Sequence, residues 1–310
     1  MVAAGYDEFS LLEENATEAG LAWSGPPAVR REVVAVGSQP ERRLSAIVWG
    51  AGEPEMVLVH GAAQNAHTWD TVALALTRPL VALDLPGHGH SDWRPDHDYS
   101  PATNAAAVAV AVAELAPAAA LVVGMSLGGL TAIRMSAIRP ELVRRLALVD
   151  ITPGTDRAEV EPILAFVSSP EVFASFDEIL RRAIAFNPNR TESSLRRGIL
   201  HNARPREDGS WVWRYDRGWA DGPGSGRSTR PEPSDLGHAP LWADLSRLAA
   251  PLLLVRGRLS QVVSDDDVAE LRRRQPRARI ETVDGAGHSV QGDRPVELAR
   301  LLAEFVATTP

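Results

Sequence analysis

Short aliphatic runs that alternate with helix-length segments most restrict how this 310-residue chain can fold. The runs span residues 56–59, 80–83, 121–123, 146–149 and 252–255. Their apolar character is continuous rather than alternating, which is typical of strands buried on both faces of a parallel sheet. Helical patterns separate the runs at 71–76, 102–116, 130–139 and 265–274. The sequence therefore predicts an α/β fold with a doubly wound, mostly parallel sheet.

Two segments depart from this alternation. Residues 31–36 and 44–49 flank a Gly-Ser-Gln-Pro sequence, which predicts an antiparallel hairpin at the sheet edge. After about residue 153 the strand pattern is lost and helical patterns dominate, so we interpret this part as an inserted helical cap. The predicted organisation is a core at 1–152 and 248–310, a cap at 153–247 and an N-terminal extension at 1–30.

Composition excludes several chemistries. The sequence contains no Cys, which excludes disulfides, thiolate metal sites and a Cys nucleophile. It contains no Lys either, which excludes a Schiff-base or P-loop lysine. The net charge of −8 argues against binding to nucleic acid or anionic membranes. We find neither a signal peptide nor an apolar stretch long enough to span a bilayer, so we expect a soluble, cytoplasmic protein.

The sequence Gly124-Met125-Ser126-Leu127-Gly128 lies between a predicted strand and a predicted helix. A G-x-S-x-G sequence in this context is typical of a tight turn that presents a nucleophilic serine above the sheet. The flanking glycines are needed because the strained turn leaves no room for side chains. Ser126 is therefore the candidate nucleophile, and the N-terminus of the following helix offers N–H groups to an oxyanion.

One histidine stands apart from the others. His288 follows the apolar run 280–283 and lies in the sequence Gly-Ala-Gly-His-Ser near the end of the chain. This position fits the chain order nucleophile, acid, histidine, so we interpret His288 as the general base. Four other histidines are interpreted as loop or cap residues: His67, His97, His201 and His238.

A glycine turn after the run 56–59 predicts the oxyanion site. The sequence His60-Gly61-Ala62 follows this strand directly, and Gly61 allows the chain to turn sharply. The backbone N–H groups of Ala62 and Leu127 are then placed to bind an oxyanion together. We interpret His60 as a structural residue that hydrogen-bonds to the loop backbone.

A metal site is the alternative interpretation of one further motif. His88, His90 and Asp92 have the H-x-H-x-D spacing of some zinc hydrolases, but Trp93 stands where another histidine is needed. The D-x-x-G-x-G-x-S pattern of residues 84–91 favours a glycine turn after a strand instead. We therefore predict no metal and no cofactor.

Four motifs in order carry a family resemblance: HGAA, DLPGHGHS, GMSLGG and GAGHS. Together they resemble the α/β-hydrolase superfamily over residues 31–152 and 248–310. The resemblance implies an α/β-hydrolase fold in which Ser126 and His288 belong to a catalytic triad. It does not identify the substrate.

The acid of the triad is the point where this chain departs from most members. Their acid follows the penultimate strand, where this sequence has Ser260 and Gln261. Asp150 instead ends the run 146–149, at the edge where active residues of open α/β sheets gather. Some small bacterial acyl esterases and their mitochondrial relatives resemble this chain in carrying the acid in a V-D-I-x-P motif. We therefore predict Asp150 as the acid, with residues 265–267 as competitors that fit a helix cap better.

The resemblance implies a serine hydrolase that cleaves a carboxylic ester or lactone through an acyl-enzyme, with a small molecule bearing an acyl carbonyl as its partner. C–C bond hydrolases acting on vinylogous diketones are the alternative enzyme. A non-catalytic ligand-binding protein is the alternative of another class, because the fold alone does not fix function. Ser126 argues against the members with an Asp nucleophile, and the sequence gives no signal for an oligomeric state.

The sequence also suggests residues for a substrate pocket. Met125 lies next to the nucleophile, and Trp211, Trp213 and Arg214 lie in the predicted cap. The tryptophans would line an apolar pocket, with Arg214 as a contact for a carboxylate. The alternative is that the tryptophans only pack the interior of the cap.

Overall fold

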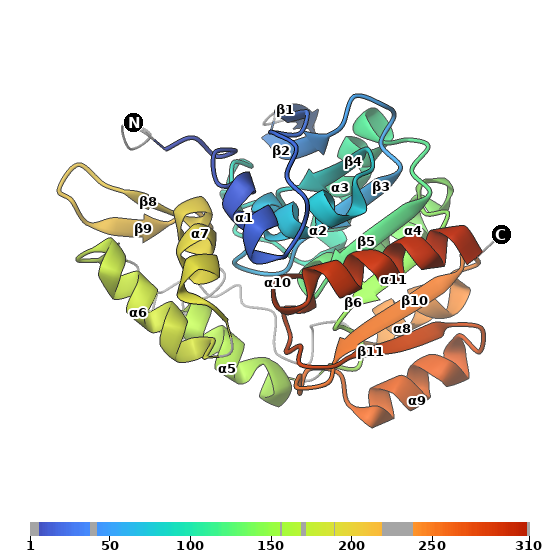
Figure 1. Cartoon of the computed structure of the whole chain (residues 1–310). Coiled ribbons are helices and arrows are strands. Elements are labelled where there is room, and N and C mark those ends of the chain that lie inside the picture. Colours follow the sequence, from blue (N-terminus) through green and yellow to red (C-terminus); the bar gives the residue numbers. More distant parts are fainter. Residues whose placement is uncertain are drawn as a thin grey trace.

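The computed structural model describes residues 6–37, 42–155, 157–168, 172–188, 190–218 and 238–308. Its centre is an eight-stranded sheet with the order β1-β2-β4-β3-β5-β6-β10-β11 (Figure 1). The strands are β1 (Val29–Val36), β2 (Arg42–Trp49), β3 (Met56–Val59), β4 (Leu80–Leu83), β5 (Leu121–Met125), β6 (Leu146–Val149), β10 (Leu252–Gly257) and β11 (Arg279–Val283). β2 pairs antiparallel with β1 and β4, and the other five pairs are parallel. The prediction of a mostly parallel sheet is confirmed.

The predicted edge hairpin is also present. β1 and β2 pair antiparallel over their full lengths, from Val29 opposite Trp49 to Val36 opposite Arg42. Residues 38–41, which contain most of the predicted turn, lie outside the described residues. Because β1 is an edge strand, its burial is incomplete, whereas every residue of β3, β4, β5 and β6 is buried.

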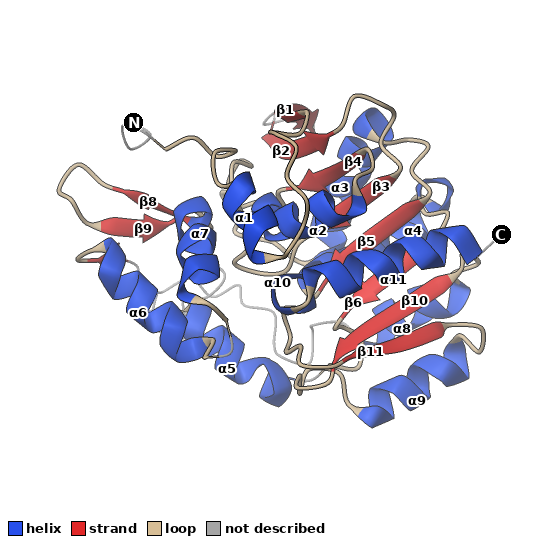
Figure 2. Ribbon diagram, in the orientation of Figure 1, coloured by secondary structure: helices blue, strands red, loops and turns tan. Residues whose placement is uncertain are grey.

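Helices cover both faces of the sheet (Figure 2). One apolar cluster joins the sheet to α3 (Pro101–Leu115), α4 (Leu127–Ile138), α8 (His238–Arg247) and α9 (Asp265–Arg274). The cluster on the other face contains residues of α1 (Leu12–Glu18), α2 (Asp70–Leu76), α10 (Val290–Asp293) and α11 (Pro295–Thr308). Two 3₁₀-helices, η1 (Ala66–Trp69) and η2 (Pro140–Leu142), complete the core. None of the described helices is long and apolar enough to cross a membrane.

The segment between β6 and β10 has a core of its own. Its elements are α5 (Arg157–Val167), β7 (Val172–Phe173), α6 (Phe176–Phe186), α7 (Glu192–Asn202), β8 (Ala203–Pro205), β9 (Trp211–Trp213) and α8. The three short strands form a separate sheet in the order β7-β9-β8 (Figure 1). Phe173, Ile179, Leu195 and Trp213 belong to an apolar cluster that is distinct from the two main clusters. α8 differs, because it packs against α4 and its Leu245 belongs to the main core.

The N-terminal residues connect the main core to α7. Leu12 of α1 is buried in the core cluster that contains α2. On α7, Arg197 donates from Nε to the side-chain oxygen of Asn15 at 2.8 Å, and it also pairs with Glu18. The N-terminal extension, which the sequence pattern left unassigned, therefore links the core to the inserted segment.

A buried ionic network lies beneath this link. Arg31 pairs with Glu8 at 2.5 Å and with Asp84 at 2.9 Å. His67 lies 2.9 Å from Asp70 through Nδ1 and 3.2 Å from Glu8 through Nε2. Burial alone would lower the pKa of His67, but the two carboxylates outweigh it and raise the pKa to about 9. Protonated His67 therefore donates hydrogen bonds to both carboxylates at neutral pH.

We expect His67 to make stability depend on pH. Its pKa is higher in the folded state than its ordinary value of 6.5, so its contribution is full below pH 6.5 and is lost as pH rises through 9. The loss should be on the order of 3 kcal/mol. Urea unfolding of the native chain and His67→Gln, measured from pH 6 to pH 10, tests this. Similar pH profiles for the two proteins would contradict the assignment.

Candidate active site

Ser126 occupies a strained turn between β5 and α4. Its backbone has φ +49° and ψ −120°, a region that L-residues rarely adopt. A Cβ on Gly124 would lie 2.4 Å from the carbonyl oxygen of Gly128, and a Cβ on Gly128 would lie 2.3 Å from that of Val59. Only glycine fits at these two positions, which explains the G-x-S-x-G pattern. The tight turn that the glycines allow presents Ser126 at the end of β5.

Asp150 and His288 meet across the carboxyl ends of β6 and β11. The Nδ1 atom of His288 lies 2.8 Å from Oδ2 of Asp150, whose side chain is fully buried. Because an ionised carboxylate only accepts hydrogen bonds, Nδ1 carries the proton and Nε2 is left with a free lone pair. Two more donors hold Asp150: the N–H of Gly257 at 2.9 Å and the hydroxyl of Ser260.

The structure explains why a serine stands at position 260, where most relatives have the acid. It lies in the loop after β10, and its hydroxyl donates to the carboxylate of Asp150. The competing acids have other partners. Asp267 accepts from the backbone N–H and the hydroxyl of Ser264 at 2.9 and 2.7 Å, as the capping box of α9. Asp265 pairs with Arg256 at 2.6 Å.

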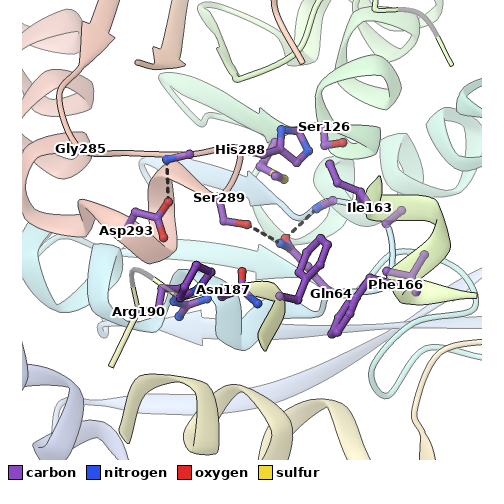
Figure 3. A pocket seen from close by; sticks show the side chains of 18 residues that line it. Gln64, Ser126, Ile163, Phe166, Asn187, Arg190, Gly285, His288, Ser289 and Asp293 are labelled. Carbon is purple, nitrogen blue, oxygen red and sulfur yellow. Dashed lines mark hydrogen bonds between the residues drawn. The ribbon is translucent and has the colours of Figure 1, made fainter. Parts of the chain in front are cut away.

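A cavity of about 350 Å³ contains Ser126 and His288 in its lining. Its apolar wall comes from Met125, Ile163, Phe166, Val167 and Phe186. Its polar lining includes Gln64, Asn187, Arg190, Ser289 and Asp293. Figure 3 shows Ser126 and His288 together, with Asn187 and Arg190 farther from the serine in this view. The cavity thus brings Ser126 and His288 together with an apolar wall and several polar side chains.

The predicted oxyanion residues lie near Ser126. Ala62 lines the cavity, and Leu127 is the first residue of α4, directly after Ser126. His60 supports this loop: its Nε2 accepts from the N–H of Leu85 at 2.9 Å, and its Nδ1 donates to the carbonyl of Gly61 at 2.7 Å. Burial lowers the pKa of His60 to about 3, so the ring is neutral and structural.

The H-x-H-x-D motif does not form a metal site. The Nε2 of His88 accepts from the N–H of Ala63 at 3.0 Å, while its Nδ1 donates to the carbonyl of Pro86 at 2.9 Å. Asp92 accepts from the backbone and side chain of Arg43. Both ring nitrogens of His88 are therefore used, and this residue fixes the loop that carries Ala62.

One described group does bring potential metal ligands together. Ligand atoms of His67, Asp70 and His201 lie within 4.8 Å of one another. The two imidazole rings stack at 3.9 Å with an angle of 12° between their planes. His67 already donates from both ring nitrogens, to Asp70 and to Glu8, so neither nitrogen is left to coordinate a metal. None of these residues lines the cavity of Ser126.

Of the suggested pocket residues, only Met125 lines the cavity. Trp213 packs against Phe173 and Tyr215 inside the inserted segment, and Trp211 packs against Phe176. Arg214 donates from Nε to a backbone carbonyl at 3.2 Å. The structure therefore gives Trp211, Trp213 and Arg214 packing contacts and places other residues of the segment in the cavity: Ile163, Phe166, Phe186, Asn187 and Arg190.

The fold agrees with comparisons to known proteins. Residues 56–301 match the model of the alpha/beta hydrolase family, and the chain belongs to that family. Esterase Rv0045c of Mycobacterium tuberculosis is 45% identical over 98% of this chain and 97% of its own length. A solved structure of that esterase has a TM-score of 0.81 at 43% identity, covering 98% of this chain and 99% of the other.

More distant relatives have other named activities. A 3-hydroxybutyrate-oligomer hydrolase of Cupriavidus necator is 28% identical over 81% of this chain and 88% of its own length. A 2-(acetamidomethylene)succinate hydrolase of Mesorhizobium japonicum is 26% identical over 83% of this chain and 89% of its own length. Family membership therefore defines the fold and leaves the substrate to be argued from the site.

Proposed function

We propose that this protein is a serine esterase in which Ser126 forms an acyl-enzyme with the acyl group of a carboxylic ester. Ester hydrolysis is supported by the esterase that is 45% identical over 98% of the chain. The observation that carries the mechanism is the 2.8 Å contact between His288 and the buried Asp150, with His288 and Ser126 lining one cavity. This is the arrangement that activates a serine for acyl transfer.

Each proposed step has a defined residue. Asp150 holds the proton on Nδ1 of His288 and stabilises the imidazolium that forms. Nε2 of His288 takes the proton from the hydroxyl of Ser126 as its oxygen attacks the acyl carbonyl. The N–H groups of Ala62 and Leu127 bind the oxyanion, and the imidazolium then protonates the leaving alcohol. Water activated by the same histidine hydrolyses the acyl-enzyme and releases the carboxylic acid.

We further propose that α5, α6 and α7, together with β7, β8 and β9, act as a cap that determines substrate size. Ile163, Phe166 and Val167 of α5 and Phe186 of α6 supply most of the apolar wall. A volume of about 350 Å³ is at the small end of the range for ligand pockets. Short and medium acyl chains are therefore the expected substrates. Lactones present the same acyl carbonyl and are a variant of this reaction.

Hydrolysis of p-nitrophenyl esters from acetate to dodecanoate tests this function. We expect kcat/KM to rise with chain length while the chain still gains apolar contacts, and then to fall by about tenfold or more once the chain exceeds the cavity. Phe166→Ala should shift the optimum to longer chains, whereas Val110→Ala, on the exposed side of α3, should not. Turnover of vinylogous diketones without turnover of any ester would instead favour a C–C bond hydrolase.

A further inference from the structure

Arg190 places a guanidinium in the lining of the Ser126 cavity. It lies just before α7, and its Nη2 donates to the hydroxyl of Ser194 at 2.6 Å. Its Nε is buried and has no hydrogen-bond partner among the described residues. The guanidinium forms no ion pair with any residue that the structure describes. Among the described residues that line the cavity, Arg190 is the one arginine.

Asp293 has the largest electrostatic effect of any acid on Arg190, but it forms no ion pair with it. The carboxylate of Asp293 accepts the N–H of Gly287 at 2.8 Å. Gly292 faces the arginine: a Cβ there would lie 3.1 Å from Cζ of Arg190. Burial lowers the pKa of Arg190 and Asp293 partly offsets this effect, yet an arginine keeps its charge in proteins.

A partly buried cation without a counter-charge is costly unless a ligand supplies one. The planar guanidinium matches a carboxylate, which can accept from its terminal nitrogens. A dianionic phosphate fits less well, because Arg190 is the single arginine of the described lining and Asp293 adds a negative charge nearby. The apolar wall of Phe166 and Phe186 suits a methylene chain that reaches from the ester to the carboxylate.

We propose that Arg190 binds a free carboxylate of the substrate, so that the preferred substrates are esters whose acyl or alcohol chain also carries a carboxylate. This inference rests on the proposed esterase function and names its substrate class. It assigns to Arg190 the role of carboxylate contact that the sequence suggested for Arg214, which instead donates to the carbonyl of Ala203.

Matched pairs of esters test the proposal. The acyl pair consists of mono-p-nitrophenyl esters of dicarboxylic acids and p-nitrophenyl esters of monocarboxylic acids with the same chain length. The alcohol pair consists of butyrate esters of ω-hydroxy acids and of the corresponding plain alcohols. In at least one pair we expect native protein to favour the charged ester in kcat/KM by about 10- to 100-fold at the best chain length. The pair that shows the preference identifies the side that bears the carboxylate.

Arg190→Gln should remove most of this preference, and Arg190→Lys should retain part of it because the charge remains. Arg196→Gln is the matched control, since Arg196 lies on α7 outside the cavity and pairs with Glu14 at 3.6 Å. This variant should prefer the charged ester as strongly as the native protein does. Equal losses on charged and neutral esters in Arg190→Gln would overturn the proposal, as would no preference in the native protein. Failure of native protein to hydrolyse any ester would refute the esterase function itself.

Discussion

Replacing Ser126 with alanine is expected to lower kcat/KM for ester hydrolysis by about 10⁴-fold or more. The hydroxyl is the proposed nucleophile, so its loss leaves only the oxyanion N–H groups and substrate binding to accelerate the reaction. The fold should be unaffected, because alanine keeps the Cβ and the strained turn is held by the glycines at 124 and 128. Initial rates on the best p-nitrophenyl ester and the thermal midpoint of each protein provide the measurement.

Ser136 offers a matched control on α4, the helix that follows Ser126. Its buried hydroxyl donates to the carbonyl of Ile133 at 2.7 Å and does not line the cavity. Ser136→Ala removes a hydroxyl that lies outside the cavity and should keep kcat/KM within about twofold, since this hydrogen bond contributes to stability and not to the reaction. If Ser126→Ala retained more than a few per cent of the native rate, the serine mechanism would be excluded.

Asp150→Asn is expected to lower kcat by about 10³- to 10⁴-fold. An amide in this position can present its NH₂ group to the ring, which would move the imidazole proton to Nε2 and remove the base that faces Ser126. The N–H of Gly257 can still donate to the remaining side-chain oxygen, and the hydroxyl of Ser260 can turn to accept from the new NH₂ group. The loss should therefore appear in kcat with little change in the thermal midpoint.

Asp267→Asn separates the two possible acids. Asp267 forms the capping box of α9 with Ser264, so its substitution should reduce stability by about 1 kcal/mol and leave kcat within about threefold. Rates and urea midpoints of both variants decide which aspartate is the acid of the triad. A large loss of kcat in Asp267→Asn, together with an active Asp150→Asn, would move the acid to the loop after β10.

The sequence predicts the core of the fold because local patterns determine it. Continuous apolar runs identify strands with two buried faces, and the runs at 56–59, 80–83 and 146–149 coincide with β3, β4 and β6. The strained backbone of Ser126 is predictable for a similar reason, because a G-x-S-x-G sequence leaves few alternatives. These features depend on residues that are close together along the chain.

Asp150 shows which contacts can be predicted from the end of a single strand and which cannot. An aspartate that ends a buried strand needs partners, and the structure supplies His288, Gly257 and Ser260. No pattern in the sequence indicates that Ser260, at the position where most relatives have the acid, donates to Asp150. That contact joins residues 110 positions apart and depends on the register between β6 and β10.

The pocket is the part that the sequence predicts least well. Trp211 and Trp213 stand out in the sequence, but large aromatic side chains also fill small hydrophobic cores, as these two do. Which side of the inserted segment faces Ser126 depends on how α5, α6 and α7 pack, and periodicity cannot determine that packing. The cavity is lined instead by Phe166, Phe186 and Arg190. The predicted cap at 153–247 includes α8, but in the structure α8 packs on α4 of the main core.

The most direct test of the triad is labelling with a fluorophosphonate, followed by peptide mapping and rate measurement by mass spectrometry. We expect one equivalent of label on the peptide that contains Ser126. The labelling rate should fall by about 10³-fold in Asp150→Asn and stay near the native value in Asp267→Asn. Label on another residue, or equal rates in the native protein and Asp150→Asn, would contradict the triad of Ser126, His288 and Asp150.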